Sequence, residues 1–282
     1  MVDPTVFVPR VNRPLDFPAK QGVVQQGTGM AIYDSKSETA RGLKGVHLYH
    51  FALSNCSQRC RFALELRGVD WTSHHLDIAK REHLTRTYRE INPNGVVPTL
   101  IHDGVVVLES NDIISYIDER FPGSGFMPQD TQDVAAVKAL LASSGDVQNT
   151  MKTLSHEYLF SARRRQISSM DIAEMQEAGA SESLTSFLTD FIADGKAWAA
   201  RLNAAHSEIK DTVQQLEERL NVSGLWLSGP SFGLADMSWA VNYYRLAQCQ
   251  MPFANAMLYE AWGSRIVEMP EFRRAVVNYR PE

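Results

Sequence analysis

Ser54 and Cys56 have the residue types and the position from which thiol chemistry is expected. They follow an apolar run at residues 46–51, which predicts a buried strand, and they precede apolar residues at helical spacing. Where a strand gives way to a helix, backbone N–H groups are unpaired and the helix dipole is positive. Such a turn stabilises an anion, and a thiolate is an anion.

The residues after this turn predict a small α/β unit that positions it. Further strands are expected at residues 72–78, 96–101 and 105–108, with a weak polar helix or loop at 81–90. Pro98 marks a strand beginning, because proline is poorly tolerated within a paired strand; whether its peptide bond is cis stays open. A helix opens at residues 109–112, where Ser110 is a second small polar residue at a helix N-terminus. On the helix after Ser54, Arg59 and Arg61 are expected on faces other than the apolar one.

Three motifs, at residues 54–64, 92–100 and 109–117, together with the order of the elements, resemble the thioredoxin-like domain of glutathione transferases. The resemblance extends from residue 46 to the C-terminus. The first motif is most similar to the zeta class (maleylacetoacetate isomerases) and to bacterial tetrachlorohydroquinone reductive dehalogenases, which share its Ser-x-Cys pattern. The long helical part is similar to those dehalogenases and to bacterial β-aryl etherases. The implied fold is an α/β thioredoxin-like N-terminal domain followed by an all-α helical C-terminal domain.

The resemblance and the Pro/Gly-rich breaks predict three parts. They are an N-terminal extension at 1–44, a thioredoxin-like glutathione-binding domain at 45–124 and an all-helical substrate-binding domain at 131–282. The extension shows no sustained periodicity and is either a loosely ordered surface arm or an arm packed through Phe7, Val8, Phe17 and Ile32. The stretch at 181–220 predicts two helices, or one kinked near Gly195.

The composition argues against several classes of protein, among them nucleic-acid-binding and membrane proteins. With 282 residues, 22% of them charged, and a formal net charge of −5, the chain lacks the basic surface that nucleic-acid binding needs. Its three cysteines provide no disulfide framework and fit a reducing compartment. No apolar run is long enough for a membrane span, no export signal is evident, and no metal-ligand spacing is present. The predicted location is cytoplasmic, with no nucleic acid, membrane or metal as partner.

The resemblance implies catalytic roles around the first turn. Ser54 matches the hydroxyl that donates a hydrogen bond to the glutathione sulfur; its other reading is a simple helix cap. Cys56 matches the cysteine that attacks a glutathionyl intermediate in the dehalogenases; its other reading is a small buried residue. Asn55 replaces the second serine of the zeta pattern, which weakens the isomerase assignment and leaves an amide that can donate to sulfur or substrate.

The resemblance also implies the contacts of glutathione, the expected co-substrate. The backbone of Val97, ahead of Pro98, pairs with the cysteinyl amide as an added strand. Glu109 holds the ammonium of the γ-glutamyl end, and Ser110 with its helix N-terminus holds the carboxylate. The alternative reading of Ser110 is a helix cap.

Other residues are open to two interpretations. The aromatic residues Trp198, Trp239, Tyr243 and Tyr158 either line a second-substrate pocket between the domains or form core. The run 163–165 is either a solvated helix face or a wall that attracts an acidic aromatic substrate. Cys60 and Cys249 are expected to be packing residues, and Asp236 a structural carboxylate that serves the amides of a helix capped by Gly233.

The leading functional hypothesis is that glutathione thiolate attacks an activated carbon of a small aromatic substrate, with β-aryl ether cleavage placed first. The alternatives are reductive dehalogenation of chlorinated hydroquinones, zeta-like cis–trans isomerisation, and a non-catalytic subunit of a heterodimer. The resemblance further implies a homodimer or a heterodimer with a related subunit.

Overall fold

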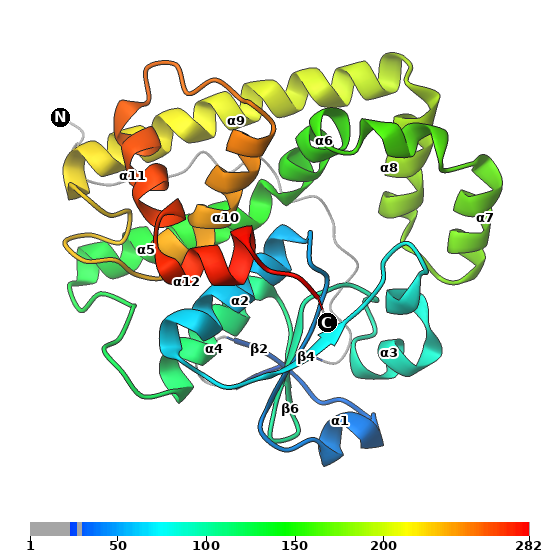
Figure 1. Ribbon diagram of the computed structural model, residues 1–282, viewed down its shortest axis with the longest axis horizontal. Helices are drawn as coiled ribbons and strands as arrows, with labels where there is room; N and C mark the ends of the chain where they lie inside the picture. The colour runs from blue at the N-terminus through cyan, green and yellow to red at the C-terminus, as the bar shows by residue number, and fades with distance from the viewer. Residues whose placement is uncertain (1–22, 27–29, 282) are drawn as a thin grey trace.

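The computed structural model describes residues 23–26 and 30–281, and it contains a mixed six-stranded sheet followed by a helical region (Figure 1). The order in the sheet is β1-β2-β6-β5-β3-β4, with β3 and β4 parallel and every other pair antiparallel. The strands are β1 (Val23–Gln26), β2 (Met30–Tyr33), β3 (Val46–His50), β4 (Thr72–His75), β5 (Thr99–His102) and β6 (Val105–Val107).

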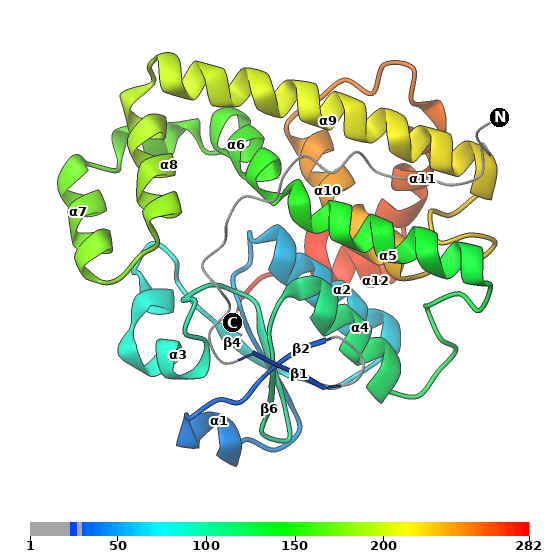
Figure 2. The ribbon, with the colours of Figure 1, turned by 180° about the vertical axis from the view of Figure 1, so that it is seen from behind.

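Alternating side chains of the central strands pack against helices on opposite faces of the sheet. Leu100 and Val107 belong to the main core together with α2 and α4, whereas Ile101 and Val106 belong to a smaller core together with α1 and α3. Figure 2 shows the same layers from behind. These helices are α1 (Glu38–Gly42), α2 (Asn55–Arg67), α3 (Arg86–Ile91) and α4 (Ser110–Arg120), with a 3₁₀ turn η1 (Glu82–Leu84) before α3.

Strands β1 and β2 form a hairpin that the sequence analysis did not predict. β2 pairs with β6, the backbone N–H of Leu108 donates to the carbonyl of Ala31, and the N–H of Ala31 donates to Asp112 Oδ2 at 3.0 Å. The sheet therefore continues past the four strands expected from the sequence. Four-residue strands are too short to show a hydrophobic period, which explains why they were missed. Packing through Phe7, Val8 and Phe17 concerns residues outside those described.

The helical region follows α4. Its elements are α5 (Thr131–Asp146), α6 (Gln148–Tyr158), η2 (Ser161–Arg165), α7 (Ser169–Glu177), α8 (Glu182–Ala193), α9 (Lys196–Ser223), α10 (Leu234–Gln248), α11 (Met257–Val267), α12 (Pro270–Phe272) and a π-turn η3 (Arg273–Val277). The predicted interruption near Gly195 is confirmed, because α8 ends at Asp194 in the left-handed region and α9 begins after Gly195. Within the described ranges, no helix is both long and apolar enough to cross a membrane.

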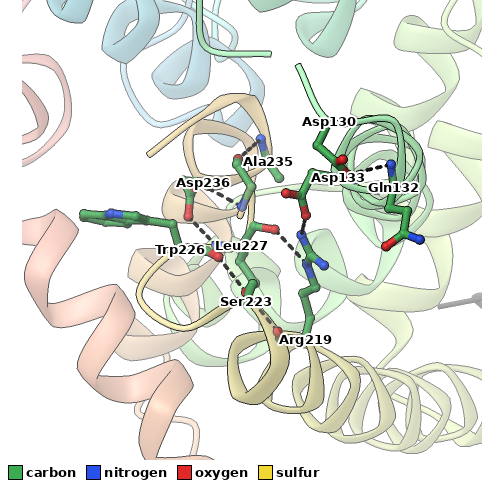
Figure 3. A network of polar contacts seen from close by, with 10 residues as sticks. Asp130, Gln132, Asp133, Arg219, Ser223, Trp226, Leu227, Ala235 and Asp236 are labelled. Atoms are coloured by element: carbon green, nitrogen blue, oxygen red, sulfur yellow. Dashed lines mark hydrogen bonds and ion pairs between the residues drawn. The ribbon is translucent and has the colours of Figure 1, made fainter. Parts of the chain in front are cut away.

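Asp236 has the structural role that was predicted. Its buried carboxylate accepts hydrogen bonds from the backbone N–H groups of Leu227 (2.8 Å) and Gly233 (2.9 Å) and from the indole of Trp262 (2.7 Å). Figure 3 shows Asp236 beside Leu227, where Arg219 also joins Asp133 to the Leu227 carbonyl. The N-terminus of α10 is thereby fixed although Gly233 has no side chain to cap it.

The aromatic residues of the helical region are mostly core. Trp239 and Tyr243 are buried in the main core, and Trp198 packs in a separate small core around α7 and α8. The interpretation that these three line a substrate pocket is therefore wrong. Tyr158 differs, because it is exposed and its hydroxyl contacts His206.

Candidate active site

Ser54 caps the N-terminus of α2 and is half-buried. Its backbone is extended (φ −75°, ψ 122°), and its Oγ accepts a hydrogen bond from the Ser57 N–H at 3.3 Å. Ser57 in turn accepts from the Phe51 N–H, which fixes the loop before the helix. Because the Ser54 oxygen acts as an acceptor within the cap, its hydrogen is left for a ligand in front of the helix N-terminus.

Asn55 and Cys56 point from the first turn of α2 toward the helical region. Asn55 Nδ2 donates to Asn242 Oδ1 at 3.3 Å, and Cys56 Sγ donates to Gln148 Oε1 at 3.5 Å. Cys56 is half-buried, whereas Cys60 and Cys249 are buried, as predicted for packing residues. Burial raises the pKa of the Cys60 thiol, and it raises that of Cys249 to about 11.

The loop before β5 is held by buried polar side chains. Tyr88 Oη donates to the Val96 carbonyl at 2.6 Å, and Asn92 Nδ2 donates to the same carbonyl and to Thr99 Oγ1, both at 2.9 Å. The Val97–Pro98 peptide bond is cis, which settles the question left open by the sequence. Among the hydrogen bonds of the described residues, none involves the backbone of Val97. That backbone can therefore pair with an extended peptide.

At the start of α4, Glu109 adopts a positive φ of 63°, and Ser110 follows as the first residue of the helix. Ser110 Oγ accepts a hydrogen bond of 2.7 Å from Nη1 of the fully buried Arg59, whose Nε donates to the Ser238 carbonyl. The hydroxyl hydrogen of Ser110 is thus directed away from Arg59, and a cation lies behind it. A hydroxyl at a helix N-terminus that accepts a hydrogen bond from a guanidinium can donate its own hydrogen to a carboxylate and bind it.

Strand register brings these three segments to the same edge of the sheet, the one at which β3 and β6 end and β5 begins. Tyr49 near the end of β3 lies opposite Thr99, and Leu100 lies opposite Val107 at the end of β6. The loops that carry Ser54, Val97 and Ser110 therefore meet at this edge, and Glu109, Asn55 and Cys56 adjoin them. The site residues proposed from the sequence thus lie in loops and helix ends at one place.

The sequence analysis did not predict that buried arginine and amide side chains lie behind this edge of the sheet. Arg59 and Arg61 were expected on other faces of α2 than its apolar one, yet both are fully buried because α10 and the C-terminal segment cover those faces. Arg245, Asn242 and Gln148 come from helices far along the chain. No local pattern marks them, because they reach α2 only through tertiary packing.

Within the arginine run at 163–165, the central residue Arg164 is committed to structural contacts. Arg164 pairs with Glu157 at 2.7 Å and with Asp194 at 3.1 Å, and its guanidinium lies over Phe191. It therefore ties η2 to α6 and α8. Over the described ranges, no three His, Cys, Asp or Glu side chains are grouped as metal ligands.

Comparison with known families agrees with this geometry. The family model for the glutathione S-transferase N-terminal domain matches residues 48–125, the segment that carries all three loops. Residues 48–125 are thus similar to a glutathione S-transferase N-terminal domain. Glutathione S-transferase 1 of Dianthus caryophyllus is 43% identical over 98 residues, 35% of this chain and 42% of that protein. A probable maleylacetoacetate isomerase of Caenorhabditis elegans is 39% identical over 100 residues, 35% of this chain and 46% of its own length. The chain spans less than half the length of these curated relatives.

Solved glutathione transferase structures share the fold over most of the chain. The β-etherase LigF of Sphingobium sp. strain SYK-6 superposes with a TM-score of 0.72 at 22% identity, covering 83% of this chain and 100% of that one. A zeta-class maleyl pyruvate isomerase gives 0.61 at 25% identity, covering 84% and 99%. The predicted fold, a thioredoxin-like domain followed by a helical one, is thus confirmed.

Proposed function

We propose that the protein binds glutathione along this sheet edge and uses its thiolate as a nucleophile. Ser54 donates a hydrogen bond to the sulfur, and the backbone of Val97 pairs with the cysteinyl amide. Ser110, supported by Arg59, receives the γ-glutamyl carboxylate, and Glu109 receives the ammonium. The observation that carries this proposal is the meeting at one edge of a cap hydroxyl, a backbone without a partner among the described residues and a Ser110 hydroxyl backed by a cation.

The energetic requirement for such a site is modest. A free thiol has a pKa near 8.5, so only a few per cent is ionised at neutral pH. A fall of about two units, which leaves most of the thiol ionised, corresponds to about 2.7 kcal/mol. One hydrogen bond to the thiolate and the dipole of α2 are each worth about 1–2 kcal/mol, so together they suffice.

The proposed reaction is attack of the thiolate on an activated carbon of an aromatic substrate, first of all a β-aryl ether. The sulfur–carbon bond forms as the carbon–oxygen bond breaks, and the aryloxide leaves and takes a proton from water. Two features support this choice. Asn55 stands where the zeta pattern has a second serine, and the helical region, the part that would face the substrate, is long, extending from α5 to η3.

A zeta-like isomerase is the second candidate, because the matched relatives include maleylacetoacetate isomerases. There the thiolate adds to a double bond, the adduct rotates about the resulting single bond, and the thiolate leaves. Reductive dehalogenation needs a further thiol to release the product, and Cys56 is the nearest candidate for it. We extend the proposal to a dimer, with itself or with a related subunit, and to a cytoplasmic location.

A product assay separates these functions. The protein is incubated with glutathione and, separately, a β-aryl ether dimer, a chlorinated hydroquinone and a maleyl diketo acid. We expect a glutathione thioether and a free phenol from the ether. Turnover of the diketo acid alone would favour the isomerase, and turnover of the hydroquinone alone the dehalogenase. If the protein neither binds glutathione nor turns over any of the three, the proposal is wrong.

A further inference from the structure

Two buried arginines hold the backbone immediately before Ser54. Arg61 donates to the carbonyls of Phe51 (3.4 Å) and Ala52 (3.0 Å), and Arg245 of α10 donates to the carbonyl of Leu53 at 2.7 Å. Three consecutive carbonyl groups thus point at guanidinium groups. Both guanidinium groups therefore lie against the peptide units that lead directly to Ser54 and the N-terminus of α2.

Neither arginine has an anionic partner in the part of the chain that the structure describes. Arg61 is 0% exposed and Arg245 is 4% exposed, and the hydrogen-bond partners of both are neutral oxygen or nitrogen atoms. Arginine stays protonated even when buried. A buried cation without a counter-ion is costly, so such groups are usually paired with a charge or a ligand.

Buried atoms without a hydrogen-bond partner gather at the same place. Of the eight such side-chain atoms among the described residues, five lie where α2 packs against α10. They are Asn55 Oδ1, Gln58 Oε1, Arg59 Nη2, Asn242 Nδ2 and Arg245 Nε. An orphaned group of this kind calls for an explanation, such as a water, an ion or a ligand. Arg245 is the one that combines an orphaned donor, a full charge and a contact one peptide unit from Ser54.

We propose that Arg245 is a positioning residue of the reaction, whose buried guanidinium takes the bound glutathione thiolate as its missing counter-ion. The inference rests on the proposed function. When glutathione binds, its thiol proton passes to solvent, and the resulting negative charge compensates Arg245. Arg61 contributes in the same direction, but it also anchors the C-terminal segment through the Ala275 carbonyl and the ring of Tyr279. Arg245 is therefore the charge that can be changed separately.

Other titratable and charged groups also surround this turn. They are His50 on β3, His74 and His75 on β4, Cys56 and Arg59 on α2, Glu109 before α4, Lys152, His156 and Glu157 on α6, Arg163 in η2, and Cys249, Tyr158, Tyr244 and Tyr279. Burial lowers the pKa of His50 to about 3 and that of His156 to about 4, so both are neutral at pH 7. Glu157 is committed to Arg164.

The first test is a titration of bound glutathione, followed by the ultraviolet absorbance of its thiolate. Arg245→Gln removes the charge and keeps a donor for Leu53, whereas Arg245→Lys keeps the charge. We expect the pKa of the bound thiol to rise by about one unit in Arg245→Gln, because a nearby buried positive charge is lost, and by less than half of that in Arg245→Lys. Affinity for S-methylglutathione, which has no ionisable thiol, should not change in either variant.

The second test keeps Arg245 and supplies the counter-ion from the protein. Ser155 Oγ lies 3.5 Å from Arg245 Nη1, so Ser155→Asp places a carboxylate beside the guanidinium. The pKa of the bound thiol should rise as in Arg245→Gln, while Ser155→Asn, of the same size but uncharged, should leave it at the wild-type value. This pair remains informative even where Arg245→Gln does not fold.

A wild-type thiol pKa in Arg245→Gln or in Ser155→Asp would overturn the inference while leaving glutathione binding intact. Equal shifts in Arg245→Gln and Arg245→Lys, with weaker binding of S-methylglutathione, would also overturn it, because they would show that Arg245 acts only by holding the loop. Failure of the wild-type protein to bind glutathione is a different result, which removes the proposed function itself.

Discussion

The two halves of α10 contrast in how their polar groups are satisfied. At the N-terminal end, the Asp236 carboxylate accepts four hydrogen bonds. Figure 3 shows the nearby ion pair of Arg219 with Asp133. Two to three turns further on, Asn242 and Arg245 face α2 with orphaned donors and no counter-ion among the described residues. A satisfied buried network stabilises the fold, whereas an unsatisfied one adjoins a place where something binds. The mutations below test this contrast.

The largest effect on stability is expected at the satisfied end. Asp236→Ala leaves four buried donors without an acceptor, and we expect the free energy of unfolding in urea to fall by about 3–5 kcal/mol. Asp133→Asn, which weakens one partly exposed ion pair with Arg219, is the control and should cost about 1 kcal/mol or less. A fall of less than about 1 kcal/mol in Asp236→Ala would show that this network does not hold the fold.

The largest effect on activity is expected at Ser54. Ser54→Ala removes the donor to the sulfur and should lower turnover by about 10- to 1000-fold. It should also cost about 1 kcal/mol of stability, because the cap of α2 is lost. Ser54→Thr keeps the hydroxyl and is the matched control for both measurements. Unchanged turnover in Ser54→Ala would remove this hydroxyl from the mechanism.

Acid should weaken the fold through the buried histidines that border the site. Burial holds the pKa of His156 at about 4 and that of His50 at about 3, below the ordinary value of 6.5. The unfolded chain therefore binds protons first, and the stability present above pH 6.5 is lost as the pH falls from 6.5 toward 4. We expect a loss on the order of 2 kcal/mol for each histidine over that range. His156→Gln should flatten this part of the curve; an equally steep curve would contradict the assignment.

The smallest effect on stability is expected where α2 packs on α10. Asn242→Leu removes an orphaned donor and replaces it with an apolar side chain of similar size. The substitution breaks the 3.3 Å hydrogen bond from Asn55 Nδ2 but also removes the orphaned Asn242 Nδ2, so the free energy of unfolding should change by less than about 1 kcal/mol, in either direction. A loss as large as that in Asp236→Ala would show that the two halves of α10 do not differ in the way we describe.

The three motifs predicted the fold, and local residue types predicted the loops of the site. Neither predicted the buried arginine side chains that lie behind those loops. The Ser54 turn, Pro98 and Ser110 are marked by residue types at strand and helix ends, so their positions could be read from the chain. The burial of Arg59 and the reach of Arg245 to Leu53 depend on the packing of α10 against α2. Arginines in amphipathic helices are normally solvated, and only the tertiary structure shows that these are not. The β1–β2 hairpin was missed because its strands are too short to show a pattern.

The central claim is that a glutathione sulfur lies anionic beside Ser54 at the N-terminus of α2. A crystal structure of the protein with glutathione tests it most directly. We expect the sulfur within about 3.5 Å of Ser54 Oγ, with the γ-glutamyl carboxylate on the hydroxyl of Ser110. A tripeptide bound with its sulfur away from Ser54, or excluded from this edge of the sheet altogether, would contradict the account.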